Sequence, residues 1–216
     1  RGELPVPVQE LGADQRDAVV ARKAVLRGPQ QREAGLPPEL IRLSIGLEAE
    51  ADILADGQLD YAASGDEVLD TLDYVVGSVH SQFRMPREAL TRRVCRAVAD
   101  PRLTMLGHAT GRLLLTRDEY DIDIDAVIDA VAEHGALVEI NADPHRLDLS
   151  WQHWPRARQR GVRTAINPDA HSVGGMFNVR YGVGIARKAW LRRDDVLNAW
   201  SLEDVKAFLA ERKDRG

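Results

Sequence analysis

The chain has 216 residues, of which 44% are hydrophobic and 29% are charged, and its formal net charge is −5. This composition is typical of a globular protein, and the length suffices for one sizeable domain with its own core. The mild acidity argues against a protein that coats nucleic acid through general basicity. With a single cysteine, Cys95, no intramolecular disulfide can form, so we expect a cytoplasmic location. No apolar run approaches the roughly 20 residues of a membrane span, so no membrane partner is expected.

In chain order, residues 1–40 form a leading segment in which only residues 13–26 predict a helix. Residues 41–216 predict one domain in which strands and helices alternate. Five buried strands are expected, at residues 41–47, 74–79, 103–106, 136–140 and 162–166. Helices are expected between and after them, at residues 65–72, 86–99, 123–134, 150–160, 194–197 and 202–212. The connections are too long for hairpins, so the pattern indicates an α/β fold with parallel strands and crossover helices.

Polar side chains with metal-binding groups follow the expected strands. In such folds the chemistry lies at the carboxyl ends of the strands. The residues at these ends are Glu48 and Glu50, His80, His108, Asn141, and the pair Asp169 and His171. In an extended segment, Asp169 and His171 would point to the same side. Each residue alone also fits a turn or strand boundary, but together they predict a site for a divalent metal such as Mn, Zn or Fe.

The remaining histidines are weaker candidates. His134 precedes the glycine expected to end a helix, where it complements the helix dipole. His153 is expected to pack near two tryptophans. His145 is intermediate, because it closely follows the fourth strand.

Arginines follow the same strand ends at a distance of a few residues. They are Arg84, Arg112, Arg146 and Arg180. Guanidinium groups bind phosphate oxygens well, so the four predict a phosphate-binding rim. Oxygen and imidazole ligands without thiolate, beside such a rim, indicate metal-dependent hydrolysis of a phosphodiester or phosphomonoester.

Several of these stretches resemble a known family. They are residues 53–61, 78–81, 107–112, 139–144 with 146–149, 169–172, 180–183 and 186–191. They resemble the PHP (polymerase and histidinol phosphatase) domain, and more narrowly the PHP domain at the C-terminal end of bacterial family X DNA polymerases. The resemblance covers roughly residues 41–212.

This resemblance implies a distorted (βα)7 TIM-like barrel, of which about five βα units are visible, with a trinuclear and usually manganese-dependent metal centre. Zn²⁺, Fe²⁺ and Mg²⁺ are the alternative ions. It implies 3′–5′ exonuclease activity in DNA repair, with the DNA 3′ end and the polymerase domains of a longer chain as partners. The matching metal ligands are Glu50 (or Glu48), His80, His108, Asp169 and His171. Arg112 and Arg146 would contact the phosphate and stabilise the charge that develops on it.

The chain also departs from the family's pattern. The family's first strands carry His-x-His and Asp-His, whereas no histidine precedes His80 here. Either those strands lie outside this chain segment or their ligands are lost. A lost set would leave a catalytically silent scaffold, and a third alternative is a phosphomonoesterase resembling histidinol phosphatase. Asn167-Pro168 replaces Ser-Thr before Asp-Ala-His, and Ala109 replaces the usual proline after Gly-His.

Overall fold

The computed structural model describes residues 44–46, 73–80, 82–172 and 174–214. The predicted helices at residues 13–26 and 65–72 and the leading segment 1–40 lie outside these residues. The same is true of Glu48 and Glu50, the alternative first ligands. These predictions therefore stay predictions.

The described strands form one parallel sheet in the order β1-β2-β3-β4-β5, with each strand paired to the next along the chain. Their bounds are β1 (Ser44–Gly46), β2 (Val76–Ser78), β3 (Met105–Leu106), β4 (Leu137–Asn141) and β5 (Arg163–Asn167). The expected α/β fold with parallel strands is confirmed. A strictly sequential order is also that of a barrel wall, whereas a doubly wound sheet reverses its order. Closure into a seven-stranded barrel stays a prediction.

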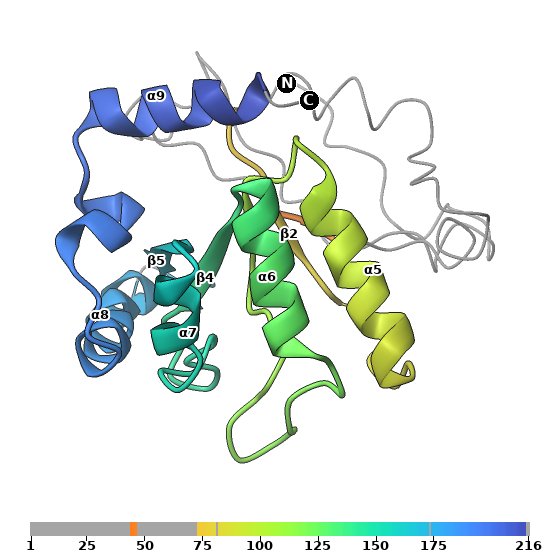
Figure 1. The fold of residues 1–216 in the computed structure, drawn as a ribbon. Helices are drawn as coiled ribbons and strands as arrows, with labels where there is room; N and C mark the ends of the chain where they lie inside the picture. Colours follow the sequence, from red (N-terminus) through yellow and green to blue (C-terminus); the bar gives the residue numbers. More distant parts are fainter. Residues whose placement is uncertain (1–43, 47–72, 81, 173, 215–216) are drawn as a thin grey trace, which may run out of the picture.

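Helices α5 to α8 cover one face of this sheet (Figure 1). They are α5 (Arg87–Ala99), α6 (Ile124–His134), α7 (Trp154–Gln159) and α8 (Val179–Lys188). The expected apolar stripe of α5 is confirmed, because Leu90, Val94 and Val98 are fully buried. They join Val127, Ile128 and Val131 of α6 in the main core, where burial of each side chain contributes about 1.5–3 kcal/mol.

The bounds of α6 follow from its capping residues. The side chain of Asp123 accepts a hydrogen bond from the backbone N–H of Ala126, which satisfies a free donor of the first turn. Gly135 ends the helix in the left-handed conformation, with φ 67°. Both ends agree with the sequence prediction.

The opposite face of the sheet changes character along the strands. Near their amino ends it is apolar, and Val76, Met105, Leu137, Ala165 and Leu197 form a second cluster. Helix α9 (Leu202–Lys213), which lies across the top of Figure 1, adds Phe208 to this cluster. Two residues further along the strands the side chains become polar, as with Ser78 and Glu139. The site is therefore expected at the end of the sheet opposite α9.

Two predictions after β5 were wrong. Residues 194–197 form no α-helix but lie in two 3₁₀ turns, η3 (Arg193–Asp195) and η4 (Leu197–Ala199). Conversely, the 3₁₀ turn η2 (Gly174–Asn178) leads into α8, which was not expected. Helix α8 contains Gly182 and Gly184, which disfavour a helix by local propensity. Tertiary packing overrides that preference, because a Cβ on Gly182 would lie 2.4 Å from Ile166 Cγ2 and 2.8 Å from Ala142 Cβ.

We therefore predict opposite effects for the two glycines of α8. Gly182→Ala should lower the free energy of unfolding by about 1–3 kcal/mol, because the new methyl group overpacks the contact with β4 and β5. Gly184→Ala should raise it by about 0.5–1 kcal/mol, because no described atom lies within 4 Å of its Cβ. Urea unfolding of both variants measures the difference, and equal effects would contradict the close packing at Gly182.

Candidate active site

The imidazoles of His80 and His108 come together at the carboxyl ends of β2 and β3. Their ring centroids lie 5.0 Å apart with the rings perpendicular. Burial, followed by neighbouring positive charge, lowers the pKa of each histidine to about 4. Both rings are therefore neutral at pH 7, and each offers a nitrogen lone pair. In the described part of the chain, the buried Nδ1 of His108 has no hydrogen-bond partner.

Glu139 is a buried carboxylate that the sequence analysis gave no role. It lies in β4 and is 1% exposed. Its Oε2 accepts hydrogen bonds from the backbone N–H of His108 at 2.8 Å and from Asn141 Nδ2 at 3.1 Å. Its Oε1 accepts one from Asn167 Nδ2 at 2.8 Å. Burial raises the pKa of Glu139, and the three donors oppose that shift. The sequence offered one sign of such a role, because Glu139 is the only charged residue in the strand Leu137–Asn141 and charged side chains are rarely buried without a partner.

Asp169 and Arg146 complete the group around the two histidines. Asp169 Oδ2 accepts a hydrogen bond from Asn141 Nδ2 at 3.1 Å and lies 3.4 Å from Arg146 Nε. The charge of Asp169 raises the pKa of His80 and His108, and the charge of Arg146 lowers it. Two imidazoles, one carboxylate and one guanidinium therefore face a common region.

His171 does not join this group in the way the sequence suggested. The extended geometry expected for Asp169 and His171 is wrong, because Asp169 has φ 48°. The exposed His171 places its Nδ1 2.7 Å from the carbonyl oxygen of Asp169. The two side chains are therefore not held on one side of the backbone, as residues i and i+2 of a strand would be.

Two of the six non-glycine residues with a positive φ in the described ranges belong to this site. His108 has φ 28° and Asp169 has φ 48°, both in a region that side chains rarely adopt. Such strain often marks functional sites. Gly107 precedes His108 for a steric reason, because a Cβ there would lie 2.6 Å from Ser78 Oγ and 3.4 Å from Glu139 Oε2.

The four arginines of the predicted phosphate-binding rim have different surroundings in the structure. Arg112 Nε donates to the carbonyl oxygen of Arg146 at 2.8 Å, and Nη2 donates to that of Leu147. Arg112 Nη1 also lies 3.3 Å from Glu119 Oε1. Arg112 therefore fixes the loop that carries Arg146, while Arg84 and Arg180 are exposed. The contact of Arg112 and Arg146 with a phosphate stays a prediction.

Asp148 holds the loop after His108 in place through hydrogen bonds to its backbone. This fully buried carboxylate accepts hydrogen bonds at Oδ2 from the backbone N–H groups of Thr110 and Gly111, at 3.0 and 2.9 Å. Burial raises the pKa of Asp148 to about 7, although the hydrogen bonds from Thr110 and the charge of Arg112 act in the opposite direction. The carboxyl group is therefore largely protonated below neutral pH.

The described residues fit part of a metal centre. The neutral imidazoles, the unpartnered His108 Nδ1 and the Asp169 carboxylate are suitable donors for a divalent transition metal. Within the described ranges, however, no three His, Cys, Asp or Glu residues are grouped as a ready-made site. Further donors would come from Glu50 (or Glu48), from a different placement of His171, or from strands outside this chain segment.

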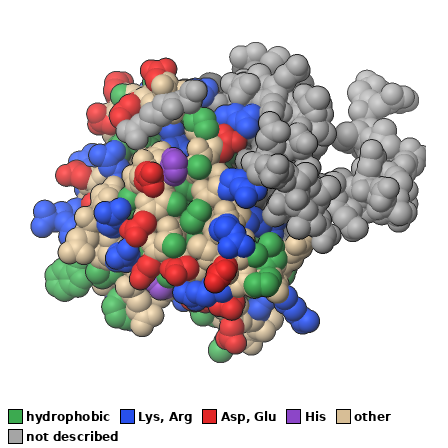
Figure 2. All heavy atoms as spheres, turned by 45° about the vertical axis from the view of Figure 1, so that its right-hand side comes forward, with side chains coloured by type: hydrophobic (Ala, Val, Ile, Leu, Met, Phe, Trp, Pro, Cys, Tyr) green, Lys and Arg blue, Asp and Glu red, His purple; other side chains and the backbone are tan. Residues whose placement is uncertain are grey.

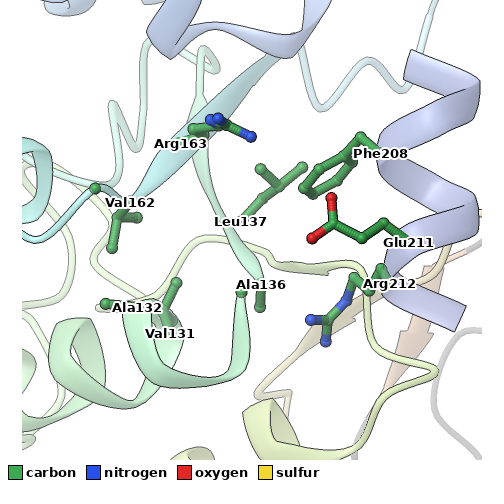
Figure 3. A pocket seen from close by; sticks show the side chains of 11 residues that line it. Val131, Ala132, Ala136, Leu137, Val162, Arg163, Phe208, Glu211 and Arg212 are labelled. Atoms are coloured by element: carbon green, nitrogen blue, oxygen red, sulfur yellow. The ribbon is translucent and has the colours of Figure 1, made fainter. Parts of the chain in front are cut away.

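A hollow of about 280 Å³ lies at the other end of the sheet from the candidate site, near α9 (Figure 3). Its carboxylate is Glu211, and Arg212 beside it donates to the carbonyl oxygens of Leu103 and His134. It lacks the histidines and the strain of the first site.

None of the helices in the described part of the chain is both long and apolar enough to cross a membrane.

The chain is similar to known proteins of two kinds. It is 42% identical over 160 residues to the DNA polymerase/3′-5′ exonuclease PolX of Bacillus subtilis, which covers 74% of this chain and 28% of PolX. It is 26% identical over 190 residues to a probable phosphatase of Caldanaerobacter subterraneus, covering 83% of this chain and 71% of that protein. A probable phosphatase of Caldicellulosiruptor saccharolyticus is 33% identical over 123 residues, which is 52% of this chain and 49% of that protein.

The chain thus spans little more than a quarter of PolX. No protein-family profile matches it. These similarities support a PHP-like domain of the phosphoesterase type, in agreement with the resemblance noted in the sequence.

We predict that Glu139→Gln lowers the free energy of unfolding by about 1–3 kcal/mol. The glutamine amide would turn an N–H group toward at least one of the three donors that now face the carboxylate. Urea unfolding measures the loss. The matched control is Glu133→Gln on the exposed face of α6, which should change the value by less than about 0.5 kcal/mol. An equally small change at Glu139 would contradict the three-donor arrangement.

The raised pKa of Asp148 predicts a specific pH dependence. Between about pH 4 and pH 7 the folded chain keeps a proton that the unfolded chain releases, so this residue's contribution to stability falls as the pH rises. The stability advantage of the natural chain over Asp148→Asn should therefore shrink by more than about 1.4 kcal/mol between pH 4.5 and pH 8, the equivalent of one pKa unit.

Urea unfolding at both pH values measures this difference, and exposed Asp118→Asn is the control. An advantage that grows with pH would show that the hydrogen bonds from Thr110 and Gly111 keep Asp148 ionised.

Proposed function

We propose that this chain is a metal-dependent phosphoesterase module of a PolX-like protein and that it removes nucleotides from DNA 3′ ends. The observation that carries the proposal is the pair of His80 and His108 at the carboxyl ends of β2 and β3, with the ion pair of Asp169 and Arg146 close enough to affect the pKa of both histidines. The similarity to a DNA polymerase/3′-5′ exonuclease adds the substrate class. In this proposal the domain is a PHP-type (βα)7 barrel.

The metal would be held by His80, His108 and Asp169, with Glu50 (or Glu48) and His171 as further ligands. Mn²⁺ is our first choice, because imidazole and carboxylate donors without thiolate suit it and the PHP resemblance favours it. When bound, such an ion polarises a phosphoryl oxygen and lowers the pKa of a coordinated water.

The chain's own residues would position and neutralise the substrate. Arg146 lies 3.4 Å from Asp169, so its guanidinium would share its donors between that carboxylate and a phosphate oxygen. Arg112 holds the carbonyl oxygen of Arg146 and thereby fixes the loop. Glu139 fixes the backbone of His108, so the direction of that imidazole is set before any ligand arrives.

A phosphomonoesterase is the second candidate, and it is favoured by the similarity to probable phosphatases. The same site would take a terminal phosphate in place of a phosphodiester. A catalytically silent scaffold is the contrasting case, because no histidine precedes His80. Activity on two substrates separates the three candidates.

We predict Mn²⁺-dependent shortening of a single-stranded oligonucleotide labelled at its 5′ end. His80→Ala and Asp169→Ala should each reduce the rate by about 100-fold or more, because each removes a donor or its orientation. His153→Ala, at the start of α7, is the matched control and should keep the rate. Release of phosphate from a 3′-phosphorylated oligonucleotide without shortening would indicate the phosphomonoesterase. Unchanged rates in both variants would exclude catalysis by this site.

A further inference from the structure

The segment that follows the candidate site differs in charge from the rest of the chain. Residues 170–193 contain no Asp or Glu, although the whole chain has 34 acidic residues and a net charge of −5. The segment contains five basic residues, which are Arg180, Arg187, Lys188, Arg192 and Arg193. By contrast, the face shown in Figure 2 mixes acidic and basic side chains. This stretch of the chain is therefore locally basic, although the chain as a whole is acidic.

Exposed aromatic side chains lie among these basic residues. Phe177 is 72% exposed and Tyr181 is 38% exposed. Phe177 lies in η2, and Tyr181 lies in the first turn of α8, four residues later. The guanidinium of Arg180 stacks on the Tyr181 ring at 4.7 Å, and its Nη2 donates to the Tyr181 hydroxyl at 2.7 Å. The ring of Phe177 is thus largely open to solvent, whereas the guanidinium of Arg180 covers one face of the partly exposed Tyr181 ring.

The surface continues along α8 without obstruction. Gly184 lies one turn beyond Arg180 and Tyr181, and a Cβ there would meet no described atom within 4 Å. Arg187 is exposed one turn further on. We refer to Phe177, Arg180, Tyr181 and Arg187 as the α8 surface.

Packing places the start of the α8 surface beside the candidate site. A Cβ on Gly175 would lie 3.2 Å from Ala170 Cα, so η2 folds back onto the loop between Asp169 and His171. Gly182 packs on Ile166 and Ala142, which lie at the carboxyl ends of β5 and β4. Phe177 and Arg180 therefore lie at the same end of the sheet as His80 and His108.

We propose that the α8 surface binds single-stranded DNA, with bases stacking on Phe177 and Tyr181 and phosphates contacting Arg180 and Arg187. Aromatic faces interleaved with basic groups are the combination that holds single strands without reading their sequence. The inference rests on the proposed function for its substrate class, and it assigns to this chain a DNA affinity that its net charge did not suggest. The strand would run from α8 toward the site with its 3′ end foremost.

The test is fluorescence anisotropy of a labelled twelve-nucleotide oligothymidine strand with the full 216-residue chain. Measurements are made in EDTA, so that binding does not depend on hydrolysis. Phe177→Leu should weaken binding at least about fivefold, because leucine keeps apolar area but has no ring to stack on a base. Arg187→Gln should lower the slope of log K against log salt by about 0.7, the value for one single-strand phosphate. Leu202→Ala, an exposed apolar residue on α9, is the control and should keep both values.

The outcomes separate this inference from the proposed function. Unchanged affinity in Phe177→Leu, or no binding of the strand at low salt, overturns the α8 surface even if the chain degrades DNA. Unchanged affinity for the DNA strand in Phe177→Leu is also the result expected if the α8 surface contacts an apolar protein partner instead of DNA. Binding that depends on Phe177 in a chain that degrades no DNA supports the α8 surface and refutes the exonuclease.

Discussion

The carboxylate of Glu139 is the contact on which the candidate site depends, because it connects three strands at their carboxyl ends. It receives donors from His108 after β3, from Asn141 in β4 and from Asn167 in β5. A buried carboxylate without such donors would cost several kcal/mol, so the three groups have little freedom to move apart. The backbone of His108 and the side chains of both asparagines are thereby fixed relative to one another.

Asn141 extends this arrangement to a second carboxylate. Its Nδ2 lies 3.1 Å from both Glu139 Oε2 and Asp169 Oδ2, so one amide separates two acids. Burial then acts in opposite directions on the two kinds of titratable group. It raises the pKa of Glu139 and Asp148 and lowers the pKa of His80 and His108. The site consequently keeps neutral imidazoles near neutral pH.

The sequence predicted the elements whose patterns are local. The parallel strands, the apolar stripe of α5 and the glycine that ends α6 are confirmed, because periodicity and helix-ending residues determine them. Helix α8 was missed because its glycines are explained only by packing on Ile166. The predicted geometry of Asp169 and His171 was wrong, because the spacing of two residues does not reveal that the backbone at Asp169 has a positive φ. The partners of Glu139 and Arg112 are distant in sequence, and some are backbone atoms, which leave no signature there.

Arg212 has a consequence for the order in which this domain is assembled. Its guanidinium donates to the carbonyl oxygens of Leu103, His134 and Asp100, which are between 78 and 112 residues earlier in the chain. Such charge-assisted bonds contribute roughly 1.5–3 kcal/mol each. The carbonyl groups that follow α5 and that end α6 thus lack these donors until residue 212 has left the ribosome. During synthesis the nascent domain would expose these carbonyl groups and the apolar residues under α9, a state in which binding by a chaperone is favoured.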